Sequence, residues 1–213
     1  REKSKKNSSY FDEGLDGFPA YGLKPGSDIK SPYRLFMPEK LYPEFSITAT
    51  VRPATENGGF LFSVVNPLET VVQLGVQLIP SGRDLTNISL LYTDPNIYAL
   101  SQTIVSFAIP SFSKKWSRFG LKVTTDNVTL FLNCHEFDTV PVKRNPLELV
   151  FDSASTLYVG QAGPLIRGAF HVSAHNFFQR YLFSSGIFTV LDLISIFYTK
   201  HALKNLSVLF LNS

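Results

Sequence analysis

The run from Phe45 to Leu78, FSITATVRPATENGGFLFSVVNPLETVVQLGVQL, constrains the fold of this chain most. Its apolar residues from Phe45 to Val51 alternate with Ser, Thr and Arg, a period of two that places one set of side chains on the buried face of a strand. Asn57-Gly58-Gly59 then supplies the positive φ angles that a tight turn needs. The alternation restarts at Phe60 and again after Pro67, so the run predicts strand, hairpin and strand.

Segments with the same pattern recur along most of the chain, separated by turn residues such as Pro80-Ser81-Gly82. The predicted strands are Tyr33–Met37 (an edge strand), Phe45–Arg52, Gly59–Val65, Val71–Leu78, Ile88–Thr93, Thr103–Ile109, Ser117–Thr124, Val128–Cys134, Leu147–Phe151, Thr156–Gly160 and Ala169–Ser173. Gly14–Ser31 is predicted as loop. Many short strands at this spacing indicate an all-β antiparallel sandwich or jelly roll.

The ends of the chain differ from this pattern. Residues 1–10 form a basic, polar leader that we expect to be disordered, and residues 11–175 form the domain. Residues 176–213 form an apolar tail, in which the polar residues between Ser185 and Thr199 fall on one helical stripe and predict an amphipathic helix. The stretch Gly186–Tyr198 is too short to span a membrane and contains Asp192, so a membrane partner is not expected.

Composition limits the classes of function. The 213 residues suit one large sandwich domain, and 19 Phe and 9 Tyr can supply its core. A net charge of +3 is too small to indicate nucleic acid as a partner. Because the chain begins with Arg rather than Met, we expect a fragment or a processed chain, and no signal peptide is visible.

Cysteine and asparagine give opposing signals about the compartment. A single cysteine, Cys134, cannot form a disulfide within the chain. Four Asn-X-Ser/Thr sequons nevertheless occur, which become glycosylation sites if the chain is secreted; they are Asn127, Asn87, Asn7 and Asn205. Asn127 is the best placed of them, because Asp126-Asn127 is predicted to form an exposed turn between two strands.

Seven motifs in order resemble those of a known family. They are GFPAY (Gly17–Tyr21), FSITATVRP with NGGFLFSV, VVQLGVQL, NISLLYTDP, KKWSRFGLKV, VTLFLNCHEF and LYVGQAG (Leu157–Gly163). Together they resemble the thrombospondin-like N-terminal domain of the multiplexin collagens, types XV and XVIII. The resemblance implies a laminin-G-like β-sandwich, secreted into the extracellular matrix, without catalytic activity or cofactor.

The chain departs from this family near its end. The family pairs the cysteine at the position of Cys134 with another just after the final strand, and that partner is absent here. Ile166–Ser173 matches the closing strand only loosely, and no Gly-X-Y repeats follow. The tail is interpreted as an alternative splice end, intron read-through or a mispredicted gene model. A trimer is expected only if the full-length protein contains a collagenous region.

Few residues offer a catalytic or metal site. Cys134 and His135 are adjacent on a predicted strand, so they point to opposite faces, and the parity of Cys134 with Leu130 and Leu132 predicts that it faces the core. His171 and His175 are interpreted as surface residues. Loop residues weighed as calcium ligands are Asp84, Asp94, Asn96 and Asp126, but no binding-loop spacing supports them, so no metal is predicted.

Among the residue groups considered, only the basic residues have a clear physical basis for binding a ligand. Arg118 and Lys122 are four apart on a predicted strand and should project from one face, while Lys114 and Lys115 precede Trp116, which is interpreted as a core anchor. Lys143 and Arg144 form a second basic pair in a loop. Such groups suit sulfated polysaccharide, since sulfates accept charge-assisted hydrogen bonds. Heparan sulfate is therefore the predicted partner, alongside other matrix components.

Two alternatives from other classes remain at this point. A lectin-like module that binds neutral sugars would need loop carboxylates and an aromatic platform, for which Asp94 and Tyr92 are the candidates. A hydrolase on the same architecture would need paired carboxylates on one face. The glutamates considered for it, Glu44, Glu69, Glu136 and Glu148, show no pairing in the sequence.

Overall fold

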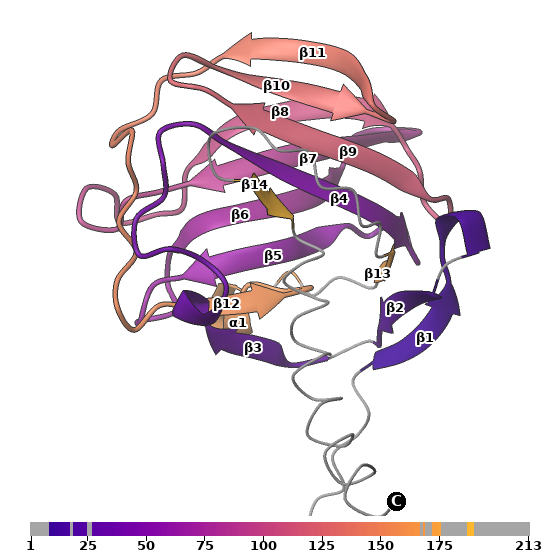
Figure 1. Ribbon diagram of the computed structural model, residues 1–213, viewed down its shortest axis with the longest axis horizontal. Helices are drawn as coiled ribbons and strands as arrows, with labels where there is room; N and C mark the ends of the chain where they lie inside the picture. Colours follow the sequence, from indigo (N-terminus) through magenta and orange to yellow (C-terminus); the bar gives the residue numbers. More distant parts are fainter. Residues whose placement is uncertain are drawn as a thin grey trace, which may run out of the picture.

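The computed structural model describes residues 9–17, 19–24, 27–166, 168, 172–175 and 187–189, which form two stacked β-sheets (Figure 1). The larger, sheet A, has the strand order β1 (Ser9–Glu13), β2 (Pro19–Leu23), β13 (Val172–His175), β4 (Phe45–Pro53), β9 (Ser117–Val123), β10 (Asn127–Leu132), β11 (His135–Pro141), with β14 (Ile187–Thr189) beside β4. Sheet B has the order β3 (Ile29–Pro32), β12 (Thr156–Val159), β5 (Gly59–Val65), β6 (Val72–Pro80), β7 (Leu85–Tyr92), β8 (Thr103–Pro110).

Neighbouring strands are antiparallel throughout these two orders, and only the added strand β14 runs parallel to β4. The predicted all-β antiparallel sandwich is therefore confirmed. The glycine turn between β4 and β5 is confirmed as well, because Gly58 and Gly59 have φ angles of 69° and 145°. A Cβ on Gly58 would lie 2.3 Å from the Leu78 carbonyl oxygen, so the turn also requires a residue that has no side chain.

Several sequence-based boundaries are wrong. Tyr33–Met37 is not an edge strand: Tyr33–Leu35 forms a 3-10 helix, and the buried Tyr33 hydroxyl donates to the Phe151 carbonyl. Leu147–Phe151 contributes a single bridge, between Val150 and Lys40, instead of a strand. Gly14–Ser31 contains β2 and most of β3, and β1 begins inside the expected leader. These short strands carry too few alternating residues to show a period of two.

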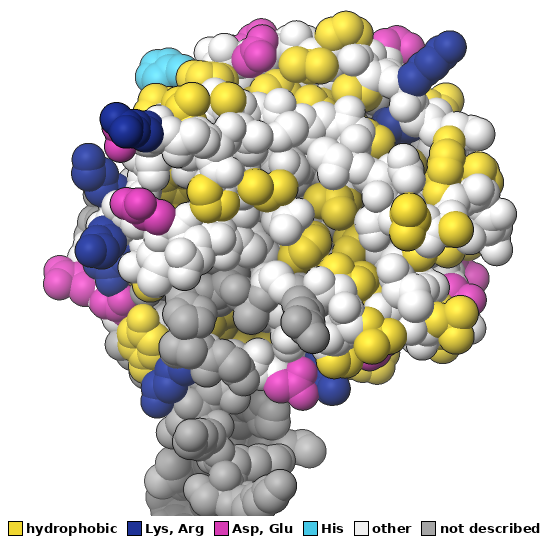
Figure 2. Space-filling view, turned by 180° about the vertical axis from the view of Figure 1, so that it is seen from behind, with side chains coloured by type: hydrophobic (Ala, Val, Ile, Leu, Met, Phe, Trp, Pro, Cys, Tyr) yellow, Lys and Arg dark blue, Asp and Glu magenta, His cyan; other side chains and the backbone are white. Residues whose placement is uncertain are grey.

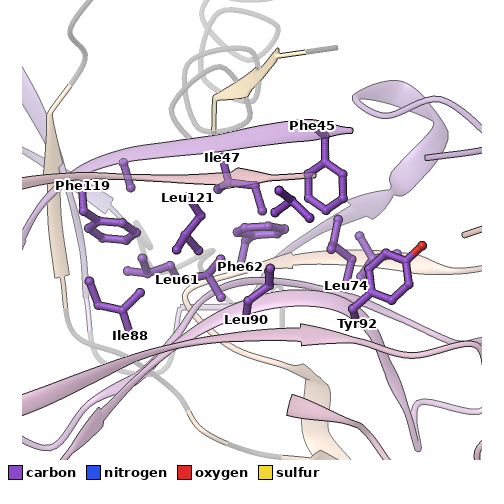
Figure 3. Packing of buried hydrophobic residues seen from close by; sticks show 14 of the residues in the cluster. Phe45, Ile47, Leu61, Phe62, Leu74, Ile88, Leu90, Tyr92, Phe119 and Leu121 are labelled. Carbon is purple, nitrogen blue, oxygen red and sulfur yellow. The ribbon is translucent and has the colours of Figure 1, made fainter. Parts of the chain in front are cut away.

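The core lies between the inner faces of the two sheets. Figure 3 shows Phe45, Ile47, Phe119 and Leu121 of sheet A facing Phe62, Leu74 and Leu90 of sheet B. Each of these side chains is at most 2% exposed. The alternation that the sequence shows in β4 and β9 is thus the alternation between this core and the outer face of sheet A.

The outer face of sheet B is covered in one half and open in the other. Over β5 and β12, a second apolar cluster built on Phe60, Val65 and Tyr158 packs beneath the short helix α1 (Gly163–Ile166). The Tyr158 hydroxyl donates a short hydrogen bond to the Glu69 carboxylate. The cluster also includes Val72 at the start of β6 and Leu91 near the end of β7, and over the rest of β6 to β8 no such cover lies among the described residues.

The predicted tail helix is not seen where the structure describes the tail. Ile187–Thr189, inside the predicted helical stretch, pairs with Ser46–Thr48 as β14. The remainder of residues 176–213 lies outside the described residues. Within the described part of the chain, no helix has the length and apolar character needed to cross a membrane.

Candidate functional site

Strand β9 presents its basic residues on the outer face of sheet A. Phe119, Leu121 and Val123 point into the core, so Arg118, Gly120 and Lys122 face outward, as the period of two predicted. Arg118 pairs with Thr50 across β4, and its Nε donates to the Thr50 hydroxyl at 3.3 Å. Arg118 and Lys122 therefore share a face, separated by about 13 Å along the strand.

The loop that precedes β9 places two lysines beside Arg118. The backbone N–H of Lys114 donates to the Pro53 carbonyl at the end of β4 (2.8 Å), which fixes this loop against sheet A. The Lys114 and Lys115 side chains are exposed, and neither forms an ion pair with another described residue. The structure thus brings Lys114, Lys115 and Arg118 to one end of the outer face.

Sequence reasoning missed a fourth member of this group, Arg52. Arg52 lies on β4 two residues beyond Thr50, the residue that pairs with Arg118. The two arginines are therefore diagonal neighbours across the two strands, with their Cα atoms about 7–8 Å apart. The outward parity of Arg52 in the FSITATVRP alternation was the available signal, but only the β4–β9 register shows which residues it meets. We call Arg52, Lys114, Lys115 and Arg118 the basic corner.

Trp116 belongs to this corner and not to the core. It is partly exposed, and the Arg52 guanidinium lies over its ring, 5.1 Å from the centroid. Arg52 also forms an ion pair with Asp12 of β1. The interpretation of Trp116 as a core anchor is therefore wrong: the tryptophan supports an arginine at the surface through a cation–π contact.

The remaining predicted basic residues lie elsewhere. Lys122 faces outward near the other end of β9, and Lys143 follows Val142, whose N–H bonds to the Asp126 carbonyl in the β9–β10 turn. Both lysines are exposed, and neither forms an ion pair within the described residues. The six predicted residues do not form one surface, because Lys122 and Lys143 lie at the opposite end from Lys114.

Arg144 is buried, which corrects the expectation of a solvent-facing basic pair. Its side chain is 7% exposed, and its guanidinium donates to the carbonyls of Leu147, Pro43 and Thr124. It also lies over the rings of Tyr92 and Phe45. The guanidinium therefore closes one end of the core and is withdrawn from polysaccharide binding.

Cys134 is exposed, so the prediction of a core-facing residue is wrong. Strand β10 ends at Leu132, and Asn133 and Cys134 form the two-residue turn to β11 with φ angles of 50° and 69°. Parity with Leu130 and Leu132 fails because the strand ends before Cys134. The thiol lies 3.9 Å from Nη1 of Arg118, beside the basic corner.

The residues considered for a lectin or a hydrolase site are engaged in contacts within the fold. Tyr92 is 3% exposed, faces the core and donates to the Leu147 carbonyl, so it offers no sugar platform. Asp94 accepts hydrogen bonds from the backbone and side chain of Asn96. Among the glutamates considered, Glu69 bonds Tyr158, Glu136 accepts from Thr139 and Glu148 pairs with Lys40.

Histidine and carboxylate side chains do not converge in the described part of the chain. His175 lies in β13 opposite Ala20, and His171 lies outside the described residues. Across the described residues, no group of three or more His, Cys, Asp or Glu is arranged to hold a metal ion.

The two described sequons lie on opposite sides of the sandwich. Asn127 starts β10, where Val128 and Leu130 point inward, so Asn127 and Thr129 face out from sheet A, and Thr129 pairs with Lys122. Asn87 lies on β7 beside inward-pointing Ile88, and therefore faces out from sheet B. Asn7 and Asn205 lie outside the described residues.

Comparison with known proteins identifies the type of domain. No family model matches the chain. It is 33% identical over 144 residues to the human collagen alpha-1(XVIII) chain, a match that covers 68% of this chain and 8% of that collagen. The chain belongs to the multiplexin collagen family through this domain. This multiplexin-type domain thus corresponds to a small part of the collagen it matches.

Solved structures with some likeness to the multiplexin-type domain include two other β proteins. A pentraxin from Limulus polyphemus is 17% identical, with a TM-score of 0.48, over 65% of this chain and 65% of the pentraxin. Domains LG4-5 of the mouse laminin alpha1 chain are 12% identical, with a TM-score of 0.43, over 69% of this chain and 37% of that structure.

Proposed function

We propose that residues 11–175 form a secreted, non-catalytic module of the extracellular matrix that binds heparan sulfate through the basic corner. The observation that carries the proposal is the convergence of Arg52, Lys114, Lys115 and Arg118 at one end of sheet A. The relationship to a collagen supports the extracellular location and the absence of catalysis.

The physical basis is the mixture of fixed and mobile cations in this corner. Arg52 is held by Asp12 and Trp116, and Arg118 by Thr50, so both guanidiniums are oriented before a ligand arrives. Guanidinium groups can donate two parallel hydrogen bonds to one sulfate, whereas lysines act as point charges. Exposed Lys114 and Lys115 can follow a flexible polyanion and release its counterions.

Heparin-affinity chromatography of the full chain tests this site. The double variant Lys114→Gln/Lys115→Gln should elute at lower salt than the wild type. The slope of log binding constant against log salt should fall by about one for each lost ionic contact. Lys122→Gln/Lys143→Gln removes the same charge from the other end of the sheet and is the matched control.

The two double variants distinguish a site from bulk charge. A large shift for the Lys114/Lys115 variant together with a small one for the control supports the basic corner. Equal shifts would assign heparin affinity to net charge alone, and elution of the Lys114/Lys115 variant with the wild type would overturn the proposed site. Circular dichroism of each variant confirms that it is folded.

A further inference from the structure

Strands β5 to β8, which make up most of sheet B, contain no charged residue. The sequences GFLFSVV, VQLGVQLIP, LTNISLLY and TIVSFAIP lack Asp, Glu, Lys and Arg altogether. The view from behind shows charged side chains gathered near the margin and hydrophobic or uncharged polar side chains across the centre (Figure 2). Most soluble surfaces mix charges among their apolar atoms, so this face needs an explanation.

The open half of this face surrounds Asn87. The β6–β7 register places Ile79 directly opposite Asn87, and the β7–β8 register places Ala108 on its other side. Ile79 and Leu85 are 38% and 42% exposed. We call the outward residues of β6 to β8 the neutral face; they are Gln77, Ile79, Leu85, Asn87, Ser89, Ser106, Ala108 and Pro110.

Strand β8 is a second place where another chain could associate, because it is the last strand in the order of sheet B and so forms an edge of the sheet. Among the described strands, it pairs on one side only, with β7. Proteins usually protect such an edge with lysine, an inward charge, a bulge or proline. Here Pro110 closes one end of the strand, and a register irregularity at Ile104 interrupts the other end. The uncharged residues from Val105 to Ile109 lie between them and form a regular edge that a second chain could extend.

The sequon Asn87-Ile88-Ser89 lies beside this edge, and its geometry allows modification. Ile88 is fully buried in the core, so Asn87 and Ser89 both point to the outer side of sheet B, where Asn87 is partly exposed and Ser89 is 1% exposed. Asn87 Oδ1 is a buried atom without a hydrogen-bond partner, whereas Nδ2, the atom that would carry a sugar, is not among the buried unpartnered atoms of the described residues. The Ser89 hydroxyl is 2.9 Å from the Ser106 hydroxyl on β8.

We propose that Asn87 carries an N-linked glycan that covers the neutral face and blocks pairing through the edge of β8. The glycan supplies the polar shield that these strands lack, from a position one strand inside the edge and opposite Ala108. Without it, the neutral face and β8 associate with a second copy of the chain. The proposal rests on secretion, which is part of the proposed function.

The test uses the full chain, secreted from mammalian cells behind a heterologous signal, with Cys134→Ser throughout to prevent intermolecular disulfides. Asn87→Gln and Ser89→Ala both remove the sequon, and Ser89→Thr retains it as the matched control. Peptide mass spectrometry after enzymatic deglycosylation reports occupancy at each asparagine. Light scattering after size exclusion reports the mass in solution over a range of concentrations.

We expect Asn87 to be glycosylated, and the parent and Ser89→Thr chains to be monomeric. Asn87→Gln and Ser89→Ala should have masses of two or more chains at high concentration. Adding Ala108→Lys to Asn87→Gln should restore the monomer, because a lysine on β8 protects the edge in place of the glycan. That rescue separates surface association from misfolding.

Two results would overturn the inference: an unmodified Asn87 in folded, secreted chain, or a monomeric Asn87→Gln variant. Occupancy at Asn127 distinguishes this failure from failure of the proposed function. If Asn127 is glycosylated and Asn87 is not, only the role of Asn87 is wrong. If the chain is not secreted in folded form even behind the heterologous signal, the extracellular function is wrong as well.

Discussion

The guanidinium of Arg144 lies over the ring of Tyr92, 5.0 Å from its centroid, and both side chains donate to one acceptor. Nη1 of Arg144 is 3.2 Å from the Leu147 carbonyl oxygen, and the Tyr92 hydroxyl is 3.0 Å from it. Burial raises the pKa of this hydroxyl against the opposing effect of the arginine charge. The pair joins the loop before β12 to the end of the core.

Arg144→Met should therefore destabilise the fold by about 3–5 kcal/mol, because the Pro43 and Thr124 carbonyls lose their guanidinium donor and the Leu147 carbonyl keeps only Tyr92. The neighbouring Lys143→Met changes the same charge at an exposed position and should cost no more than about 0.5 kcal/mol. Urea denaturation followed by tryptophan fluorescence measures both. A loss below about 1 kcal/mol for Arg144→Met would mean that the guanidinium is not structural.

Cys134→Gly should be more stable than Cys134→Ala by about 1 kcal/mol. Cys134 has a φ of 69° in the turn between β10 and β11, a conformation that is strained for residues with a Cβ and favourable for glycine. The alanine variant removes the thiol but keeps the Cβ, so the comparison isolates the backbone. Thermal unfolding under reducing conditions gives the difference, and equal stability of the two variants would argue against the positive φ.

Tyr158→Phe should reduce stability by about 1–2 kcal/mol, since it removes the hydrogen bond to the Glu69 carboxylate. Burial and this hydrogen bond raise the pKa of Tyr158 above its ordinary value of 10. The unfolded chain then loses the tyrosine proton first, so unfolding becomes easier as the pH rises above about 10.

That alkaline loss of stability should be smaller in Tyr158→Phe than in the wild type. Urea denaturation at several alkaline pH values measures it, with the exposed Tyr42→Phe as control. If Tyr158→Phe and Tyr42→Phe followed the same pH dependence, the buried hydrogen bond would not be the cause.

A glycan at Asn127 should hide Lys122 from polyanions, because Lys122 is directly opposite Thr129 of the same sequon. In secreted protein that carries the Asn127 glycan, Lys122→Gln should leave the salt concentration of heparin elution unchanged. In the Asn127→Gln background, which lacks this glycan, the same substitution should lower that salt concentration slightly. The four proteins form a double-mutant cycle, and the coupling between the two positions is the quantity measured. Additive effects would place the glycan away from Lys122.

Local patterns predicted the strands that have many alternating residues. β4, β5, β8 and β9 were located within one or two residues of their ends, and the shared face of Arg118 and Lys122 followed from the same period of two. The short strands β1, β2 and β11 were missed, since five to seven residues with glycine, proline or charges give no clear period. The predicted strand Val128–Cys134 extends two residues beyond the end of β10 at Leu132, so Cys134 was assigned to the core-facing side of a strand although it lies in an exposed turn.

The sequence by itself determined the antiparallel sandwich and its relationship to a collagen domain, because both depend on order and periodicity along the chain. Only the tertiary structure decided the separate fates of Lys143 and Arg144, one exposed and one buried over Tyr92. It alone brought Arg52 to the basic corner and Asn87 beside the uncharged edge of β8. Those placements depend on strand register between distant segments, which no pattern within a single segment records.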